Sequence, residues 1–138
     1  MIMYSKKKLM KTIITLSLLG LIPFYLENIF SILEINYYLP QNIKLIYGSM
    51  IVSFLSGMQW QRFIEQKINS GLKFILPMLN FIWTWSYIFK FFNPVFIIIS
   101  GLILSLFIDL FIQKKFIDYN FNKVRILATI LAIFSFFI

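Results

Sequence analysis

Residues 94–115 read PVFIIISGLILSLFIDLFIQKK, an apolar run that starts at a proline, contains one carboxylate and ends at two lysines. A helix of about 20 apolar residues is long enough to cross the hydrocarbon core of a bilayer. Such a helix satisfies its own backbone hydrogen bonds, so lipid can surround it. The run therefore predicts a transmembrane helix over about residues 94–113.

Further apolar stretches flank this run, at about residues 11–32, 43–64, 72–92 and 121–138. Asn93 and Pro94 predict a tight turn before the 94–113 helix, because proline suits the first turn of a helix. Asn120 or Asn122 is available as the N-cap of the last helix. The pattern predicts an all-α integral membrane protein, in which one domain, residues 1–138, forms a compact bundle of five transmembrane helices.

The last stretch leaves one structural alternative open. At about 1.5 Å per residue, a helix over residues 121–138 reaches roughly 27 Å, against about 30 Å of hydrocarbon. It spans only if it stands upright or if the bilayer thins around it. Four spans followed by one half-inserted helix is therefore the alternative to five spans.

The distribution of basic residues predicts the orientation, because short loops rich in lysine and arginine stay cytoplasmic. Of the 13 lysines and arginines, all but Lys44 and Lys90 fall on one side of the predicted bundle. That side includes the amino-terminal segment, so we expect the amino terminus in the cytoplasm. With five spans, the carboxyl terminus lies outside. Tyr37 and Tyr38, in the connection before residue 43, are typical of an interfacial aromatic belt.

Composition and charge exclude several classes of protein. The chain is 60% hydrophobic and only 13% charged, outside the averages for soluble domains. The net charge of +8 does not indicate nucleic-acid binding, because the basic residues sit at the ends of apolar runs rather than along one soluble face. We expect them to meet anionic lipid at the cytoplasmic face. Without cysteine or histidine, the chain lacks disulfides, thiolate nucleophiles and the commonest metal ligand.

Two faces of small and polar residues recur at four-residue steps. One consists of Ser49, Ser53 and Gly57, with Trp60 beside it, and the other of Gly101, Ser105 and Asp109. Small residues at this spacing let two helices approach closely in lipid, where packing and inter-helix hydrogen bonds drive association. We interpret both as packing faces inside the bundle; a hydroxyl-lined ion path is the alternative for the first.

Acidic residues within the predicted spans are stronger candidates for a structural or functional role than the small residues, because an intramembrane carboxylate is costly unless it is paired or functional. Asp109 and Arg125 should lie at comparable depth on the cytoplasmic side, so we predict an ion pair that joins the last two helices. Glu27, near the outer end of the first span, is expected to extend to the outer interface. Pro23 frees a carbonyl one turn earlier and predicts a kink in that span.

Several segments together resemble the domain-of-unknown-function 3429 family. They are residues 19–24, the block from Tyr47 and Gly48 to Trp60, Pro77, Asp109 and residues 124–129. The chain departs from the family pattern at Ser56 and Gln61, where the family has glycine. The resemblance implies a small multi-span protein of bacteria or mitochondria and no established activity.

These observations favour a non-enzymatic protein of the bacterial cytoplasmic (inner) membrane that needs no cofactor. We expect an accessory, assembly or stabilising component of a larger membrane complex, bound to a membrane-protein partner or to further copies of itself. The alternative is an oligomeric proton- or ion-coupled transporter or channel that uses Glu27 or Asp109. A catalytic carboxylate pair is not expected, because these two residues are predicted near opposite faces of the membrane.

The predicted topology can be tested with a reporter fused after Ile138. Five spans place the fusion outside the cytoplasm, so alkaline phosphatase should be active there and a cytoplasm-dependent fluorescent protein dark. A fusion after Gln66, in the gap after the second predicted span, is the control and should give the opposite pattern. A fluorescent fusion after Ile138 would instead favour four spans.

Overall fold

The computed structural model of the chain describes residues 2–34, 42–66, 70–112 and 119–138, and these residues form helices joined by short turns. Tyr37, Tyr38, Lys67, Lys114 and Lys115 lie outside the described residues. The α-helices are α1 (Ile2–Leu19), α2 (Ile22–Ile32), α3 (Ile43–Glu65), α4 (Gly71–Trp85), α5 (Pro94–Phe107) and α6 (Tyr119–Phe134). A 3₁₀ turn, η1 (Ser86–Phe89), continues α4, and a π-helical turn, η2 (Ile108–Ile112), continues α5.

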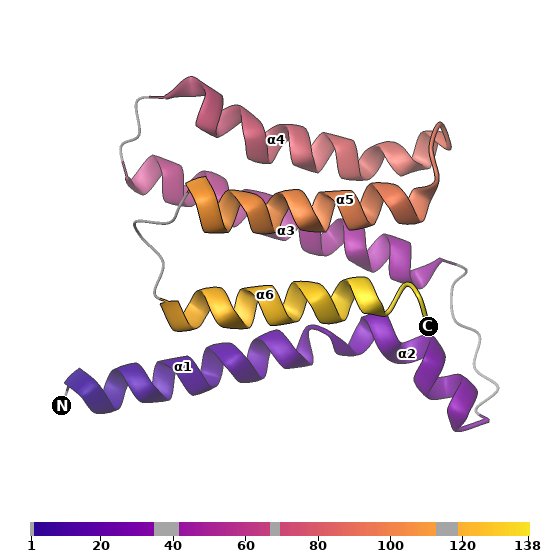
Figure 1. Ribbon diagram of the computed structural model, residues 1–138, viewed down its shortest axis with the longest axis horizontal. Coiled ribbons are helices and arrows are strands. Elements are labelled where there is room, and N and C mark those ends of the chain that lie inside the picture. Colours follow the sequence, from indigo (N-terminus) through magenta and orange to yellow (C-terminus); the bar gives the residue numbers. More distant parts are fainter. Residues whose placement is uncertain (1, 35–41, 67–69, 113–118) are drawn as a thin grey trace.

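The helices lie side by side with their long axes roughly aligned, and the two ends of the chain lie toward opposite ends of the bundle (Figure 1). α3 packs against α2, α4 and α5, and α6 packs against α1 and α5. One end of the bundle therefore gathers the end of α3, the start of α4, the end of η2 and the start of α6. We call it the basic end, because Arg62, Lys73 and Arg125 all lie near it.

The first predicted span is broken rather than continuous. α1 and α2 meet at Gly20 and Leu21 with a bend of 49°. Pro23 lies in the first turn of α2, where its missing N–H costs nothing. The Gly20 carbonyl, at the break, accepts a hydrogen bond of 2.7 Å from the Tyr47 hydroxyl of α3. The predicted kink is confirmed, and it falls just before Pro23.

The turn before α5 forms as the sequence predicts. The Asn93 side chain accepts a hydrogen bond of 2.9 Å from the Val95 backbone N–H, and Pro94 starts the helix. Lys90 adopts a left-handed backbone conformation with φ 55°. The prediction for the last helix is wrong in detail, because α6 begins at Tyr119 and so contains both Asn120 and Asn122. It ends at Phe134 rather than continuing to residue 138.

Length and hydropathy allow two helical segments, Gly71–Phe89 and Pro94–Ile112, to cross a membrane. The bent pair of Met10–Leu19 and Ile22–Ile32 would be a third if it forms one span. α3 has 23 residues but carries Lys44, Arg62 and Glu65, and α6 has only 16 residues. Within the described residues, the chain is thus a helical bundle with two or three helices apolar and long enough to span, and five spans stay a prediction.

The small-residue faces differ in what they contact. A Cβ atom added to Gly48 would collide with the Ile98 side chain of α5, and one added to Gly101 would collide with Thr84 of α4. Gly57, by contrast, has open space around it. Four-residue steps rotate a helix face by about 40° each, so the row that starts at the buried Ser49 reaches the surface at Gly57. The prediction that Gly57 packs inside the bundle is therefore wrong.

The two glycines of α3 should respond oppositely to the same substitution. Gly48→Ala should lower the free energy of unfolding by about 1–3 kcal/mol, because Ile98 is fully buried and cannot move aside. Gly57→Ala should be neutral or slightly stabilising, because alanine favours the helix and meets no neighbour. Thermal unfolding in one detergent compares the two, and equal melting temperatures would show that α3 and α5 do not pack as closely as described.

Candidate functional site

A buried carboxylate organises the basic end of the bundle. Asp109, only 2% exposed, accepts a hydrogen bond of 2.7 Å on Oδ2 from Arg125 Nε of α6. Its Oδ1 accepts a bond of 2.9 Å from Gln59 Nε2 of α3. Arg62 Nη1, also from α3, lies 3.8 Å from the same oxygen. We call these four residues the Asp109 cluster; they join α3, η2 and α6 through one side chain.

Local backbone geometry aims the Asp109 carboxylate inward. Asp109 is the second residue of the π-helical turn η2, where the extra residue shifts the register of the helix. One turn earlier, Ser105 Oγ accepts a hydrogen bond of 3.2 Å from Arg125 Nη2. The Ser105 carbonyl accepts one of 2.9 Å from Gln59 Nε2. Ser105 and Asp109 therefore hold the same two partners, and Gly101, Ser105 and Asp109 form the buried face that the sequence predicts.

The predicted Asp109–Arg125 ion pair is confirmed, but sequence reasoning missed Gln59 and Arg62. The spacing of Gln59 could have indicated that it is buried. It follows Ser49 and Ser56 on the buried face of α3, at the positions that a heptad pattern places on one side of a helix. Trp60, which the sequence places beside the face of Ser49, Ser53 and Gly57, is 47% exposed and lies outside the Asp109 cluster.

A second polar cluster lies at the opposite end of the bundle. Lys44 Nζ of α3 donates to Asn28 Oδ1 of α2 at 2.8 Å and to the Ser135 carbonyl beyond α6 at 3.1 Å. It also lies 3.7 Å from Glu27 Oε2. A cation at the carboxyl end of a helix stabilises the last carbonyls. Glu27 is partly exposed, as expected for an interfacial position, but sequence reasoning did not identify its partner Lys44.

A hollow of about 180 Å³ lies between α3 and α4. Its lining consists of Ser53, Ser56, Gly57, Trp60, Pro77, Met78 and Phe81. Ser56 is 5% exposed, and within the described residues its Oγ has no hydrogen-bond partner. Trp85 Nε1 of α4 donates to Ser53 Oγ at 2.8 Å, which holds the two helices together beside the hollow. We call this feature the α3–α4 hollow.

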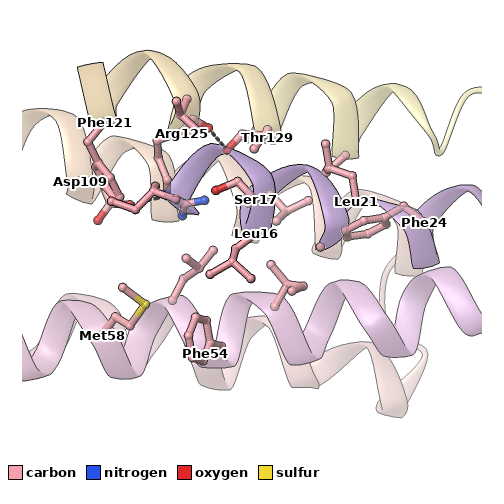
Figure 2. A pocket seen from close by; sticks show the side chains of 18 of the residues that line it. Leu16, Ser17, Leu21, Phe24, Phe54, Met58, Asp109, Phe121, Arg125 and Thr129 are labelled. Carbon is pink, nitrogen blue, oxygen red and sulfur yellow. Dashed lines mark hydrogen bonds and ion pairs between the residues drawn. The ribbon is translucent and has the colours of Figure 1, made fainter. Parts of the chain in front are cut away.

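The Asp109 cluster closes one end of a larger cavity of about 460 Å³. α1, α3 and α6 form its long walls, and Leu21, at the break before α2, and Phe24 of α2 lie at the far end (Figure 2). Asp109, Phe121 and Arg125 gather at the near end. The lining between the two ends is mostly apolar, with Leu16, Phe54 and Met58 among the side chains that point into the space. We call it the lateral cavity.

Comparison with known proteins identifies the family. Residues 9–138 match the family model described as a protein of unknown function (DUF3429). The chain belongs to this family. No curated protein and no solved structure matches it. The region that matches DUF3429 includes both polar clusters, the α3–α4 hollow and the whole lining of the lateral cavity.

Each polar cluster of this DUF3429 protein contains an ion pair, Asp109 with Arg125 in one and Glu27 with Lys44 in the other. Among the described residues, no group of three metal-ligating side chains comes together. Asp109 is held by charge-assisted hydrogen bonds, which are the strong class of hydrogen bond. The Asp109 cluster is therefore a junction between helices, and the bundle also contains two mostly apolar recesses, the α3–α4 hollow and the lateral cavity.

Removal of the charge on Asp109 should destabilise the protein strongly. Asp109→Asn leaves the Arg125 and Arg62 guanidinium groups without their shared carboxylate, and loss of one partner of a buried pair costs about 3–5 kcal/mol. The melting temperature in detergent and the yield of monodisperse protein measure this. Glu65→Gln is the control, since Glu65 is an exposed acid at the same end of the bundle. Equal effects of the two variants would contradict a structural role for Asp109.

Proposed function

We propose that this protein is a non-enzymatic accessory, assembly or stabilising component of a larger membrane complex, and that it binds a helix of a partner membrane protein at the α3–α4 hollow. The observation that carries the proposal is the hollow itself. Ser56 Oγ has no partner among the described residues, and Gly57 presents open space beside it. A buried hydroxyl without a partner in an apolar setting costs free energy that a partner helix can recover.

The chemistry of the hollow fits a helix better than a small polar ligand. Small residues let a helix backbone approach closely in lipid, and Gly57 is the point of closest access. Trp60, Met78 and Phe81 flank it with large apolar side chains that can pack around an incoming helix. A hydroxyl or amide on that helix could pair with Ser56 Oγ.

We place the bundle in the bacterial cytoplasmic membrane with five spans and a cytoplasmic amino terminus. The aligned helices and the opposite positions of the two chain ends support five crossings (Figure 1). α3, with 23 residues, reaches about 34 Å, enough for a span. Arg62, Lys73 and Arg125 near one end of the bundle agree with a cytoplasmic basic face.

The pairing of both carboxylates favours this proposal over an ion-coupled transporter. A coupling carboxylate must exchange its partners during transport, whereas Asp109 is held by Arg125 and Gln59. Glu27 lies beside Lys44. In reconstituted vesicles, flux that disappears in Glu27→Gln but persists in wild type would favour the transporter instead.

Photo-crosslinking tests the partner site directly. A photoreactive phenylalanine analogue at Met78, which lines the hollow and is 58% exposed, should crosslink one defined membrane protein in native membranes. The same analogue at Leu79, 55% exposed but outside the hollow, is the matched control and should give much less of that product. The product is identified by mass spectrometry.

A substitution that blocks the hollow completes the test. Gly57→Leu should keep the melting temperature close to wild type and reduce the Met78 product, because the side chain occupies open space that the partner needs. A second copy of this chain in the product would make the protein a homo-oligomer. Equal crosslinking from Met78 and Leu79, unaffected by Gly57→Leu, would refute a partner at this site.

A further inference from the structure

We infer that the lateral cavity binds one acyl chain of an anionic phospholipid, with the headgroup phosphate at Arg62 and Arg125. This site shares no lining residue with the α3–α4 hollow, so it does not rest on the proposed function. It requires only that the bundle lies in a bilayer.

The dimensions of the lateral cavity suit an acyl chain. Its volume of about 460 Å³ lies within the usual range of ligand pockets in proteins, about 300–1,000 Å³. Its wall on α3 extends from Ile51 to Arg62, a distance of about 16 Å at the rise of an α-helix. One leaflet of a bilayer contributes about half of the 30 Å hydrocarbon core. The cavity is thus as deep as one leaflet.

The lining separates polar and apolar character along the length of the cavity. Asp109 and Arg125 gather at one end (Figure 2), and Arg62 lies there too, 3.8 Å from Asp109. Beyond them the walls present aliphatic and aromatic side chains, including Leu16, Leu55, Leu102, Val124 and Ala128. A bound molecule must therefore be polar at one end and apolar along the rest, as a lipid is.

The sign of the charge selects the headgroup. Two guanidinium groups and one carboxylate line the near end, so the lining carries an excess of one positive charge. Arg125 makes the short contact to Asp109 at 2.7 Å, whereas Arg62 lies 3.8 Å away and its side chain is 24% exposed. Arg62 also stands over the Phe121 ring, 5.5 Å from its centroid, and both residues line the cavity. A phosphate with net negative charge suits this position, and guanidinium groups bind phosphate in bidentate geometry.

The position of the charged end agrees with a headgroup near the interface. Arg62 lies in the last turn of α3, and Asp109 lies in the turn that completes the α5 segment. Both are therefore close to helix ends, where headgroups lie, rather than at mid-membrane. α1, which packs mainly on α6, forms one long wall of the cavity.

Photoreactive lipids test the inference. The wild-type protein is placed in phosphatidylcholine vesicles with a small fraction of phosphatidylglycerol that carries a diazirine on its acyl chain, and labelled residues are mapped by mass spectrometry. Labels should concentrate on cavity residues such as Leu16, Leu55 and Ala128. A phosphatidylcholine probe with the same chain has the same phosphate but adds a choline cation, which the two arginines repel, so it should label these residues about tenfold less.

Matched variants separate the headgroup from the chain. Arg62→Gln should reduce cavity labelling by phosphatidylglycerol about tenfold, and Arg62→Lys should reduce it less, because lysine keeps the positive charge but not the bidentate geometry. Lys73→Gln, which removes a cation near the same end of the bundle but outside the cavity, should have no effect. Ala128→Phe fills the cavity and should abolish labelling, whereas Leu127→Phe, at an exposed neighbouring position, should not.

Labelling is normalised to monodisperse protein, so a variant that folds poorly is not counted as a loss of binding. Labels spread evenly over exposed residues such as Leu79 and Ile82 would show ordinary boundary lipid and overturn the inference. Equal cavity labelling by both lipids would overturn the assignment of an anionic headgroup.

Discussion

One buried carboxylate is the constraint on which the rest of this bundle depends. A carboxylate that is only 2% exposed is tolerated only if opposite charge and hydrogen-bond donors surround it. Arg125 of α6 and Gln59 of α3 both donate hydrogen bonds to Asp109, which lies in the turn after α5. The carboxylate therefore joins three helical segments. The orientation of α3 about its axis follows, because Gln59 must face inward. Gly57 and Trp60 then lie on the outer side and border the α3–α4 hollow.

Unequal packing among the helices explains where the lateral cavity lies. α3 packs closely on α5 at Gly48, and α5 packs closely on α4 at Gly101. α1 and α6 meet α3 less closely, and the space between them is the lateral cavity. Lys44, at the opposite end, links α2 and the end of α6 to α3. Polar contacts thus join the helices at both ends of the bundle, and the lateral cavity lies between these two ends.

The sequence predicted the helices well, because long apolar runs and Asn93–Pro94 mark them in one dimension. It also predicted the Asp109–Arg125 pair, because two opposite charges at similar depth in lipid have few other partners. The partners of Gln59 and Lys44 could not be predicted from the sequence. Their partners depend on which helices are neighbours, and apolar helices in lipid give no hydrophobic face to indicate it. The error at Gly57 has the same origin, since small residues occur on buried and exposed faces alike.

A double-mutant cycle between Asp109 and Arg125 tests the central claim most directly, since it measures the coupling between these two side chains after subtraction of their individual effects. The free energy of unfolding is determined for wild type, Asp109→Asn, Arg125→Gln and the double variant. If the pair fastens α5 and α6, the coupling energy should be about 2 kcal/mol or more, within the range for residues of one ion-pair network. A coupling near zero, with additive single effects, would mean that Asp109 and Arg125 act independently and that the bundle is held together in another way.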